Sequence, residues 1–349
     1  MAGAAAGQAL ARTFEAALNA KKSAARKFLT RDVSPTKYRA YAASVVPKHN
    51  VVGVGVGGKL EGGELTDRLA IRFYVEKKIA AVPPEYALPS EWQGLPTNVI
   101  ETGVFFALPV GVALAGSQPA PGQKKIRPAR PGCSVGFQFP PPNHGYVMAG
   151  TLGALVTKDG AYAILSNNHV LANENSLPIG SPIFQPGLLD NGDPNTDRIA
   201  KLTDFEPLQP KGNNSLDCAI AALDADSLAT GRPLPKVNKL KSGDPLEPAE
   251  EMPVMKVGRT TDYTEGVIFD ISADVTVQYG IGNLSFQNQI LIRGTSDTPQ
   301  FSAAGDSGSL IVHRVKRAPV GLLFGGSGSY TIANPIAAVL KRFDVAIVT

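Results

Sequence analysis

A single serine stands in a segment whose residue types suit a nucleophile. Ser307 lies in the run Gly-Asp-Ser-Gly at 305–308, and an apolar, strand-like run follows at 310–312. Gly305 lacks a Cβ and can turn sharply, so the backbone N–H groups of Gly305 and Ser307 can point at one spot. Two such donors can form an oxyanion hole for an acyl-transfer intermediate. A serine hydroxyl alone is inert, however, and requires a base that is oriented by a carboxylate.

The chain supplies both partners upstream of the serine. His169 follows an apolar, strand-like run that ends at 165, and Asp217 leads the apolar run 219–221. The three residues stand in the order His, Asp, Ser, with separations of 48 and 90 residues. This is the order of chymotrypsin-type peptidases, not that of subtilisin or the α/β-hydrolases. In that arrangement the serine attacks the scissile carbonyl, the histidine transfers the proton and the aspartate holds the imidazole tautomer.

Short segments of the chain resemble the motifs of chymotrypsin-like (trypsin-fold) serine peptidases. Residues 305–310 resemble the Gly-Asp-Ser-Gly-Gly box, Asn168-His169-Val170 the Ala-His-Cys box, and 217–220 the Asp-Ile-Ala-Leu box. The segments 257–261, 266–268 and 325–328 are similar, in that order, to the bacterial streptogrisin and α-lytic branch. The whole chain is similar to intracellular trypsin-like proteins of bacteria and plants, the narrow-leaf type among them. The resemblance is best over residues 130–349.

This resemblance implies a mainly β fold with a chymotrypsin-like double β-barrel. It also implies a serine endopeptidase that needs no cofactor and acts on peptides or proteins. The strand at 320–326 would lie beside the substrate and lend it backbone hydrogen bonds. The residues implied in substrate binding are Phe301, Phe324, Gly325 and Gly326. An acidic residue six positions before the nucleophile would select Arg or Lys. Phe301 stands there, so we expect a preference for an apolar or small side chain.

Three positions near the serine carry expectations of their own. Ser309 replaces the second glycine of the serine box. Phe324 stands where many relatives place a serine beside the catalytic aspartate, so we expect Asp217 to lack its usual donor and the activity to be lower. Asp306 pairs with a freed N-terminal amine in activated relatives. No convincing activation junction is evident in this chain, and we expect Asp306 to fix the oxyanion loop by another hydrogen bond.

The composition suits a turn-rich β protein, with 36 Gly and 28 Pro among 349 residues. The net charge of +4 does not by itself indicate a nucleic-acid partner. We expect the two cysteines, Cys133 and Cys218, to be buried free thiols rather than one disulfide. So few cysteines favour a reducing compartment. The chain shows neither a signal-peptide pattern nor an 18-residue apolar run, so we expect a cytoplasmic protein without a transmembrane segment.

The pattern along the chain predicts four parts. They are a basic helical segment at 1–48, a small α+β domain at 49–115, a linker at 116–131 and a peptidase domain at 132–349, with barrels at 132–228 and 253–349. Periodicity predicts a helix at 7–30, a hairpin of strands at 51–57 and 69–75 and a third strand at 97–108. The family resemblance also implies a closing helix at 335–343. The Val-Gly repeat at 51–57 lacks the following Lys-Ser/Thr and the helix of a phosphate-binding loop.

The charge of the first part is skewed, with nine Lys/Arg and two acidic residues within 1–48. A basic amphipathic helix can meet a membrane surface, nucleic acid or a protein partner. The plainer interpretation is a solvated basic face on a docking or oligomerising helix, and we favour it. A homo-oligomer formed through this region is therefore one hypothesis, and nucleic acid is disfavoured.

Two polar stretches leave alternatives open. Asp190, Asp193 and Asp197 have a spacing that suits calcium ligands, but the bidentate glutamate of an EF-hand is missing, and we favour a polar turn. No metal site is therefore predicted. The basic residues of the linker, Lys124, Lys125, Arg127 and Arg130, suit either trypsin-like cleavage or, more simply, an exposed connection.

The leading functional hypothesis is a serine endopeptidase. One alternative is a scaffold that keeps the peptidase fold with little turnover, suggested by Phe324 and by the long N-terminal extension. Another is a peptidase activated only by a partner or by oligomerisation. The presence of all three chemical groups argues against a pure scaffold.

Overall fold

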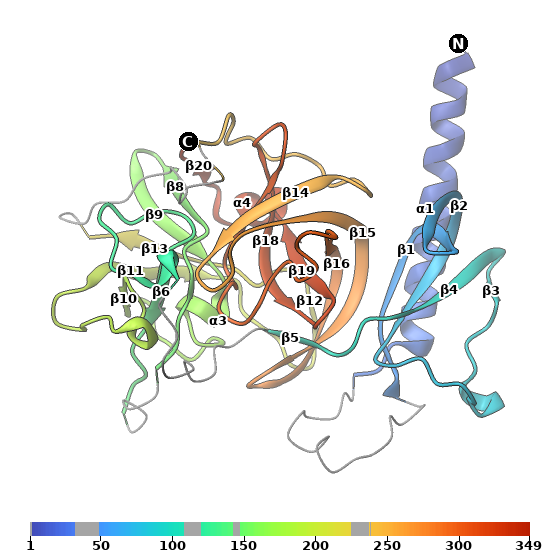
Figure 1. Ribbon diagram of the computed structural model, residues 1–349, viewed down its shortest axis with the longest axis horizontal. Helices are drawn as coiled ribbons and strands as arrows, with labels where there is room; N and C mark the ends of the chain where they lie inside the picture. Colours follow the sequence, from blue (N-terminus) through green and yellow to red (C-terminus); the bar gives the residue numbers. More distant parts are fainter. Residues whose placement is uncertain (1, 32–48, 108–119, 142–146, 225–236, 238) are drawn as a thin grey trace.

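The computed structural model describes residues 2–31, 49–107, 120–141, 147–224, 237 and 239–349. The fold is mainly β, with two curled sheets side by side (Figure 1), and the described residues form three α-helices; this confirms the predicted architecture. The helices are α1 (Ala2–Phe28), α3 (Asn168–Leu171) and α4 (Ile336–Phe343), with 3-10 turns η2 (Pro84–Tyr86), η3 (Pro121–Gln123) and η4 (Leu188–Asp190). No helix in the described ranges is both long and apolar enough to cross a membrane.

The first sheet has eight strands in the order β20-β8-β9-β13-β11-β10-β6-β7. The strands are β6 (Ser134–Phe137), β7 (Gly150–Thr151), β8 (Ala154–Lys158), β9 (Ala161–Ser166), β10 (Pro182–Phe184), β11 (Arg198–Phe205), β13 (Ala219–Leu223) and β20 (Ala346–Ile347). The turn between β8 and β9 places Asp159 and Gly160 at positive φ, as a two-residue hairpin requires. The second strand of this hairpin leads directly into α3, which contains His169.

The second sheet has twelve strands, eleven of them in the order β12-β16-β19-β18-β17-β14-β15-β1-β2-β4-β3, with β5 pairing β15 and β18. The C-terminal members are β12 (Asn213–Asn214), β14 (Pro253–Gly258), β15 (Asp262–Tyr279), β16 (Gly282–Gly294), β17 (Leu310–His313), β18 (Pro319–Gly326) and β19 (Tyr330–Pro335). The N-terminal members are β1 (Val51–Glu61), β2 (Glu64–Val75), β3 (Glu91–Trp92), β4 (Leu95–Glu101) and β5 (Phe105–Ala107). The N-terminal hairpin therefore continues the sheet that carries the serine.

The Val-Gly repeat of β1 has a packing explanation. Its valines at 54 and 56 are buried under α1, while its glycines face a buried group of charges. A Cβ at Gly55 would lie 2.0 Å from Oδ2 of Asp270, and a Cβ at Gly57 would lie 1.7 Å from Oε1 of Glu250. The predicted hairpin is confirmed, and only glycine leaves room for these carboxylates.

The predicted N-terminal helix is present, and its buried face docks onto the second sheet. Its alanines at 17, 20 and 24 pack on the hairpin, and Lys21 is fully buried. The Lys21 ammonium donates to Oδ1 of Asp274 (2.7 Å), the carbonyl of Ser272 (2.7 Å) and Oδ1 of Asn288 (2.9 Å). This side chain fixes α1 to the sheet.

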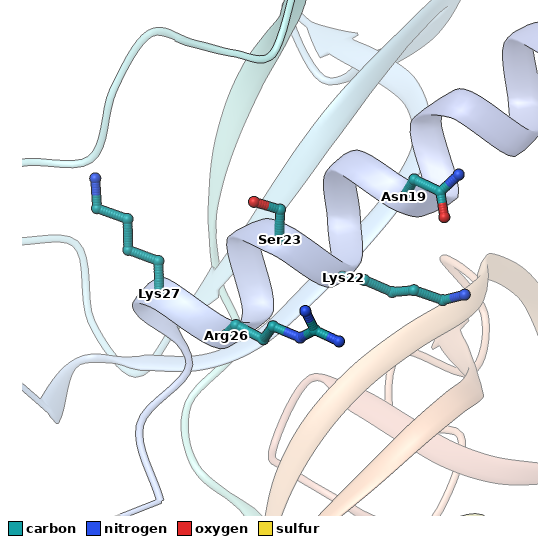
Figure 2. Close-up of a pocket in the computed structure, with 5 residues that line it drawn as sticks. All are labelled: Asn19, Lys22, Ser23, Arg26 and Lys27. Carbon is teal, nitrogen blue, oxygen red and sulfur yellow. The ribbon is translucent and has the colours of Figure 1, made fainter.

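The outward face of α1 is polar and basic. A surface pocket of about 380 Å³ is lined by Asn19, Lys22, Ser23, Arg26 and Lys27, whose side chains are drawn in Figure 2. Its Lys22 and Arg26 side chains extend on the opposite side of the helix from Lys27 (Figure 2). The helix thus combines a docking face with a solvated basic face, in line with the plainer of the two interpretations.

The prediction of one strand at 97–108 is wrong in its extent. The strand β4 ends at Glu101, and β5 begins again at Phe105. Between them the amide of Thr102 bonds the carbonyl of Val75, and Gly103 has a φ of 74° that turns the chain. β4 runs parallel to β2, whereas β5 joins β15 and β18, and Leu108 lies outside the described residues.

The predicted linker packs partly on the first sheet over its described part, while its basic side chains Lys124, Lys125 and Arg127 are exposed, as the simpler interpretation expects. Gly122 and Ala129 are buried. Lys125 pairs with Asp197, and the Arg127 guanidinium donates to the carbonyl of Gln185 at 2.9 Å. Residues 116–119 and 225–236 lie outside the described ranges, and the proposed domain boundaries stay predictions.

Both cysteines are free and buried, as the sequence predicted. Burial raises the pKa of the Cys133 thiol to about 12 and that of Cys218 well above its usual value. Both thiols are therefore protonated and unreactive near neutral pH.

Candidate active site

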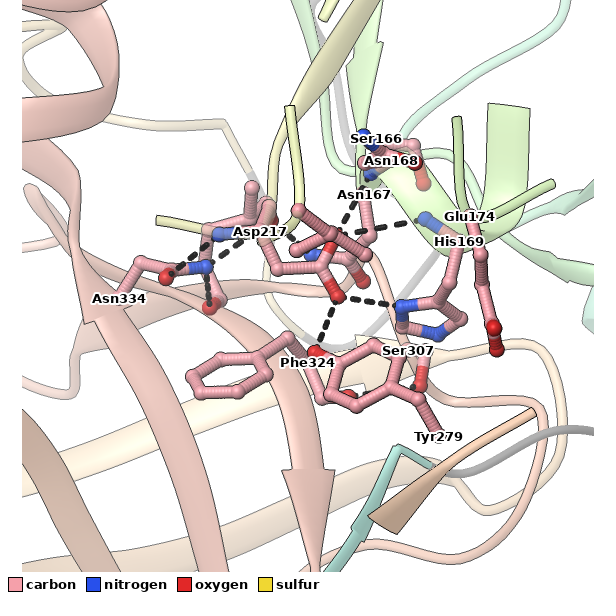
Figure 3. Close-up of polar contacts among 12 residues, drawn as sticks. Ser166, Asn167, Asn168, His169, Glu174, Asp217, Tyr279, Ser307, Phe324 and Asn334 are labelled. Carbon is pink, nitrogen blue, oxygen red and sulfur yellow. Dashed lines mark hydrogen bonds and ion pairs between the residues drawn. The ribbon is translucent and has the colours of Figure 1, made fainter. Parts of the chain in front are cut away.

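The three residues predicted for catalysis meet where the two sheets adjoin (Figure 3). His169 comes from the short helix α3 directly after β9, and Asp217 comes from the segment just before β13. Ser307 comes from the loop that leads into β17 of the second sheet. The amide of Thr151 in the first sheet donates to the carbonyl of Ser307 at 2.8 Å, so the serine loop is tied across the junction.

His169 and Asp217 form a close buried pair. The imidazole Nδ1 lies 2.5 Å from Oδ2 of Asp217. The other oxygen, Oδ1, accepts the backbone amides of Asn168 (2.7 Å) and His169 (3.3 Å). An ionised carboxylate bonded in this way assigns the proton of the neutral ring to Nδ1 and leaves the lone pair of Nε2 as the base.

Tyr279, at the end of β15, also contacts Asp217, and sequence reasoning missed it. Its hydroxyl donates to Oδ2 of Asp217 at 2.7 Å. Burial, followed by the charge of Asp217, raises the pKa of Tyr279 well above its usual value, so the phenol stays protonated and donates. The expectation that Phe324 leaves Asp217 without its donor is therefore wrong, because a residue from another strand provides one. A tyrosine at a strand end carries no sequence signal of this role.

The segments around this cluster are held in place by further polar contacts. The Asn334 side chain accepts from the Asp217 amide (3.0 Å) and donates to the Asp217 carbonyl (3.0 Å). The carboxylate of Glu174, just after α3, accepts the amides of Gly280 (2.9 Å) and Ile281 (2.8 Å). Through these contacts the histidine segment holds the turn that follows Tyr279.

The serine is buried beside the imidazole but is not bonded to it. Ser307 Oγ lies 3.4 Å from the carbonyl oxygen of Phe324. Within the described ranges, Nε2 of His169 is buried and has no hydrogen-bond partner. A proton acceptor and a hydroxyl thus lie together, with the hydroxyl turned toward the backbone of β18 (Figure 3). Such bonds are often long before substrate binds.

Asp306 fixes the serine loop, as the sequence predicted. Its Oδ1 accepts the amides of Thr260 (2.9 Å) and Thr261 (3.1 Å), and its Oδ2 accepts the Thr261 hydroxyl (2.6 Å) and the Ala303 amide (3.0 Å). The Lys256 ammonium lies 3.2 Å from Oδ2, and both charged side chains are fully buried. Burial lowers the pKa of Lys256, and the charge of Asp306 opposes that shift.

Two hydroxyl groups fix the orientation of two peptide groups in the serine loop by donating hydrogen bonds to their carbonyl oxygens. The Thr260 hydroxyl donates to the carbonyl of Ala304 (2.7 Å), and the Ser309 hydroxyl donates to that of Asp306 (2.6 Å). The N–H of a trans peptide points opposite to its carbonyl, so the amides of Gly305 and Ser307 are turned away from these hydroxyls. Among the described residues neither amide donates a hydrogen bond, and Gly305 has a φ of 94°. Ser309, the departure from the serine box, thus has a structural use.

The residues expected to bind substrate divide into two kinds. Phe301 is buried in a cluster with Val254 and Ile268, and Phe324 is buried with its ring 4.8 Å from that of Phe286. What these two rings contribute to a specificity pocket stays a prediction. Gly325 and Gly326, by contrast, present backbone groups at the edge of β18, and those groups pair with β5.

The acidic residues considered for calcium are used elsewhere. Asp190 pairs with Arg259, Asp197 pairs with Lys125, and Asp193 accepts the amide of Asn195 at 2.8 Å. No cluster of three or more metal-ligating side chains occurs in the described ranges. The polar-turn interpretation accounts for these contacts.

The site can be compared with known proteins. Residues 233–334 match the family model described as the Nal1 C-terminal domain. No curated protein matches the chain in sequence.

Among solved structures, a glutamic acid-specific serine protease, described as using a histidine triad in substrate binding, is 18% identical over 63% of this chain and 100% of its own, with a TM-score of 0.46. Thermobifida fusca protease A is 16% identical with a TM-score of 0.45, and the Nocardiopsis protease NAPase is 15% identical with a TM-score of 0.45. Each of the two covers 63% of this chain and 100% of its own.

Proposed function

We propose that this protein is a serine endopeptidase that uses Ser307, His169 and Asp217. The observation that carries the proposal is the buried His169–Asp217 pair: Nε2 of His169 has no hydrogen-bond partner among the described residues and lies beside the serine. A histidine with only a structural role would be expected to bond at both ring nitrogens when buried. An unbonded basic nitrogen next to a hydroxyl suits proton transfer.

The proposed reaction is acyl transfer in two steps. Ser307 Oγ rotates to Nε2 of His169 and attacks the scissile carbonyl carbon while its proton passes to Nε2. The imidazolium is stabilised by Asp217 and then gives that proton to the leaving amine as the C–N bond breaks, which leaves an acyl-enzyme. Water repeats the sequence, with His169 as base, and releases the acid and free Ser307.

The amides of Gly305 and Ser307 would stabilise the oxyanion of both tetrahedral intermediates. Their peptide planes are held by Thr260 and Ser309, so the donors need no reorganisation during the reaction. One oxyanion donor is typically worth about 3 kcal/mol in the transition state.

The test is labelling by a fluorophosphonate probe, which reacts with a serine that a base has activated. Wild-type protein should be labelled at Ser307, as identified by mass spectrometry of the modified peptide. The variants Ser307→Ala and His169→Ala should lose labelling, and Asp217→Asn should slow turnover by about 10⁴-fold. His313→Ala serves as the matched control, because Nδ1 of His313 accepts the backbone amides of Val315 and Lys316 within its own turn. Well-folded wild-type protein that takes up no probe would contradict the proposal.

A further inference from the structure

Along the edge of β18 that faces the serine, successive residues bond first to β17, then to the serine loop and then to β5. Leu322 pairs with Leu310 of β17, and the Leu323 carbonyl then accepts the amide of Gly308 at 2.8 Å. The Phe324 carbonyl accepts a hydrogen bond from Ser307 Oγ at 3.4 Å. The next two positions, Gly325 and Gly326, pair with β5. The pairing of β18 with β5 therefore takes over on this edge where the contacts of the serine loop stop, with Ala107 at the carboxyl end of β5 nearest to that loop.

A peptide cleaved at Ser307 needs main-chain partners close to the serine. Extended peptides commonly bind by adding a strand to a sheet edge, and the backbone N–H and C=O groups of that edge supply the affinity. The groups next to Ser307 along this edge belong to Gly325 and Gly326. In this structure they are paired with Ala107 and Phe106 of the same chain.

The direction of β5 also suits a substrate. It is antiparallel to β18, with Phe106 opposite Gly326 and Ala107 opposite Gly325. The strand therefore runs toward Phe324 and Ser307 with its carboxyl end leading. A substrate whose residues before the scissile bond lie on this edge would approach the nucleophile in the same direction.

The sequence of β18 is adapted to this close neighbour. A Cβ at Gly325 would lie 2.7 Å from the carbonyl oxygen of Phe106, so only glycine admits the strand at this spacing. On its other side β5 pairs in parallel with Val277 and Gln278 of β15, and the Phe105 side chain is fully buried. The strand is short but has a neighbour on each side.

We propose that β5 occupies the place of the substrate residues that precede the scissile bond, and that the chain inhibits itself in this conformation. The proposal rests on the endopeptidase function proposed above. It adds that an extended substrate can pair with Gly325 and Gly326 only after β5 has left this edge. Only the small fraction of molecules in which β5 is displaced can then bind such a substrate, and the activity of the whole sample is lowered in proportion to that fraction.

The test compares two reactions of the same serine in wild type and Phe106→Pro. Proline lacks the N–H of a central strand and disfavours β5 between its two neighbours. A small fluorophosphonate needs no pairing with β18, so its labelling rate at Ser307 should stay within about threefold of wild type. Hydrolysis of an unstructured protein such as fluorescently labelled casein should rise by about tenfold or more, as expected for removal of a competing conformation. Val99→Pro, in the exposed part of β4, is the matched control and should leave both rates unchanged.

Each result separates the two proposals. Absence of labelling in wild type and in Phe106→Pro would remove the endopeptidase function itself. Labelling of both, with equal casein hydrolysis, would overturn self-inhibition by β5 and leave the endopeptidase intact. If Phe106→Pro fails to fold by circular dichroism, Phe106→Gly replaces it. A synthetic peptide of residues 102–107 added to the activated variant should restore inhibition, and its failure to compete with casein would count against the proposal.

Discussion

The hydroxyl of Tyr279 and the imidazole of His169 bind the same oxygen of Asp217. Oδ2 accepts from Tyr279 at 2.7 Å and from Nδ1 of His169 at 2.5 Å. The two rings stand edge to face with their centroids 5.9 Å apart. The orientation of the carboxylate is therefore set in part by a residue that lies 62 positions away in the chain and comes from the other sheet.

Replacement of Tyr279 by phenylalanine should lower kcat/KM for a peptide substrate by about tenfold or more, because a hydrogen bond to a charged group is worth roughly 1.5–3 kcal/mol. The rate of fluorophosphonate labelling should fall in parallel, while thermal stability changes little. Tyr263→Phe removes a hydroxyl that bonds Glu265 at 2.5 Å rather than Asp217, and is the control. Equal kinetics for Tyr279→Phe and wild type would show that the hydroxyl does not position Asp217.

Replacement of Lys256 by methionine should leave the buried carboxylate of Asp306 without its cation. Breaking a buried pair in this way costs about 3–5 kcal/mol of unfolding free energy, as measured by urea denaturation. Labelling of Ser307 should also be lost, because Asp306 holds the serine loop. The double variant Lys256→Met/Asp306→Asn should regain stability but not labelling.

The exposed pair of Arg314 and Glu265 provides the control for that experiment. Arg314→Met should change stability by less than about 1 kcal/mol, as expected for a surface ion pair. Comparable losses in Lys256→Met and Arg314→Met would mean that the burial of Lys256 has no energetic consequence.

Replacement of Lys21 by methionine should release α1 from the second sheet. Three bonds of the ammonium are lost and Asp274 keeps a buried charge, so the unfolding free energy should fall by about 3 kcal/mol. Limited proteolysis should then cut within residues 1–31 faster than in wild type. Lys22→Met, the neighbouring residue on the solvated face, should stay within about 0.5 kcal/mol of wild type. Equal cleavage of the two variants would argue against a docking role for Lys21.

The pH dependence of stability should carry a contribution from Asp270. Burial raises its pKa from 3.8 to about 6, although Arg72 and Tyr74 oppose the shift. Between pH 3.8 and about 6 the folded protein therefore keeps the proton on Asp270, whereas the unfolded chain has lost it. The contribution is fully present below about pH 4 and is lost as pH rises through 6. Relative to Asp270→Asn, wild type should lose about 3 kcal/mol of unfolding free energy between pH 4 and 7.

Equilibrium unfolding in urea at several pH values measures this difference. Asp67→Asn, an exposed acid on β2, is the control and should track wild type across the whole range. A constant difference between wild type and Asp270→Asn would mean that the proton affinity of Asp270 is the same in the folded and unfolded chains.

The sequence predicted those parts of the fold and site that depend on local pattern. The strand-like runs, the N-terminal helix and the buried cysteines follow from periodicity and composition. The juxtaposition of His169, Asp217 and Ser307 followed from motif order. Asp306 was also correctly expected to fix the serine loop, although its buried partner Lys256 was not identified.

The missed features depend on long-range pairing. Tyr279 reaches Asp217 only because β15 ends beside α3, and β5 reaches β18 only because Gly103 turns the chain out of β4. A single strand was predicted at 97–108 because its residue types are strand-like on both sides of the turn. Phe324 was expected to weaken the site because the replacement donor lies on another strand. No local pattern specifies such partners.

The pairing of β1 with β15 has a consequence for any shortened form of the protein. Gly53 and Val54 cover the backbone of Val275 and Asp274 in the middle of the large sheet. A chain that began near residue 121 would retain the three reactive groups but expose that stretch of β15 as an open edge beside apolar residues. Open apolar edges recruit strands from other molecules. We therefore expect the first third of the chain to protect the portion that contains His169, Asp217 and Ser307 from aggregation through β15.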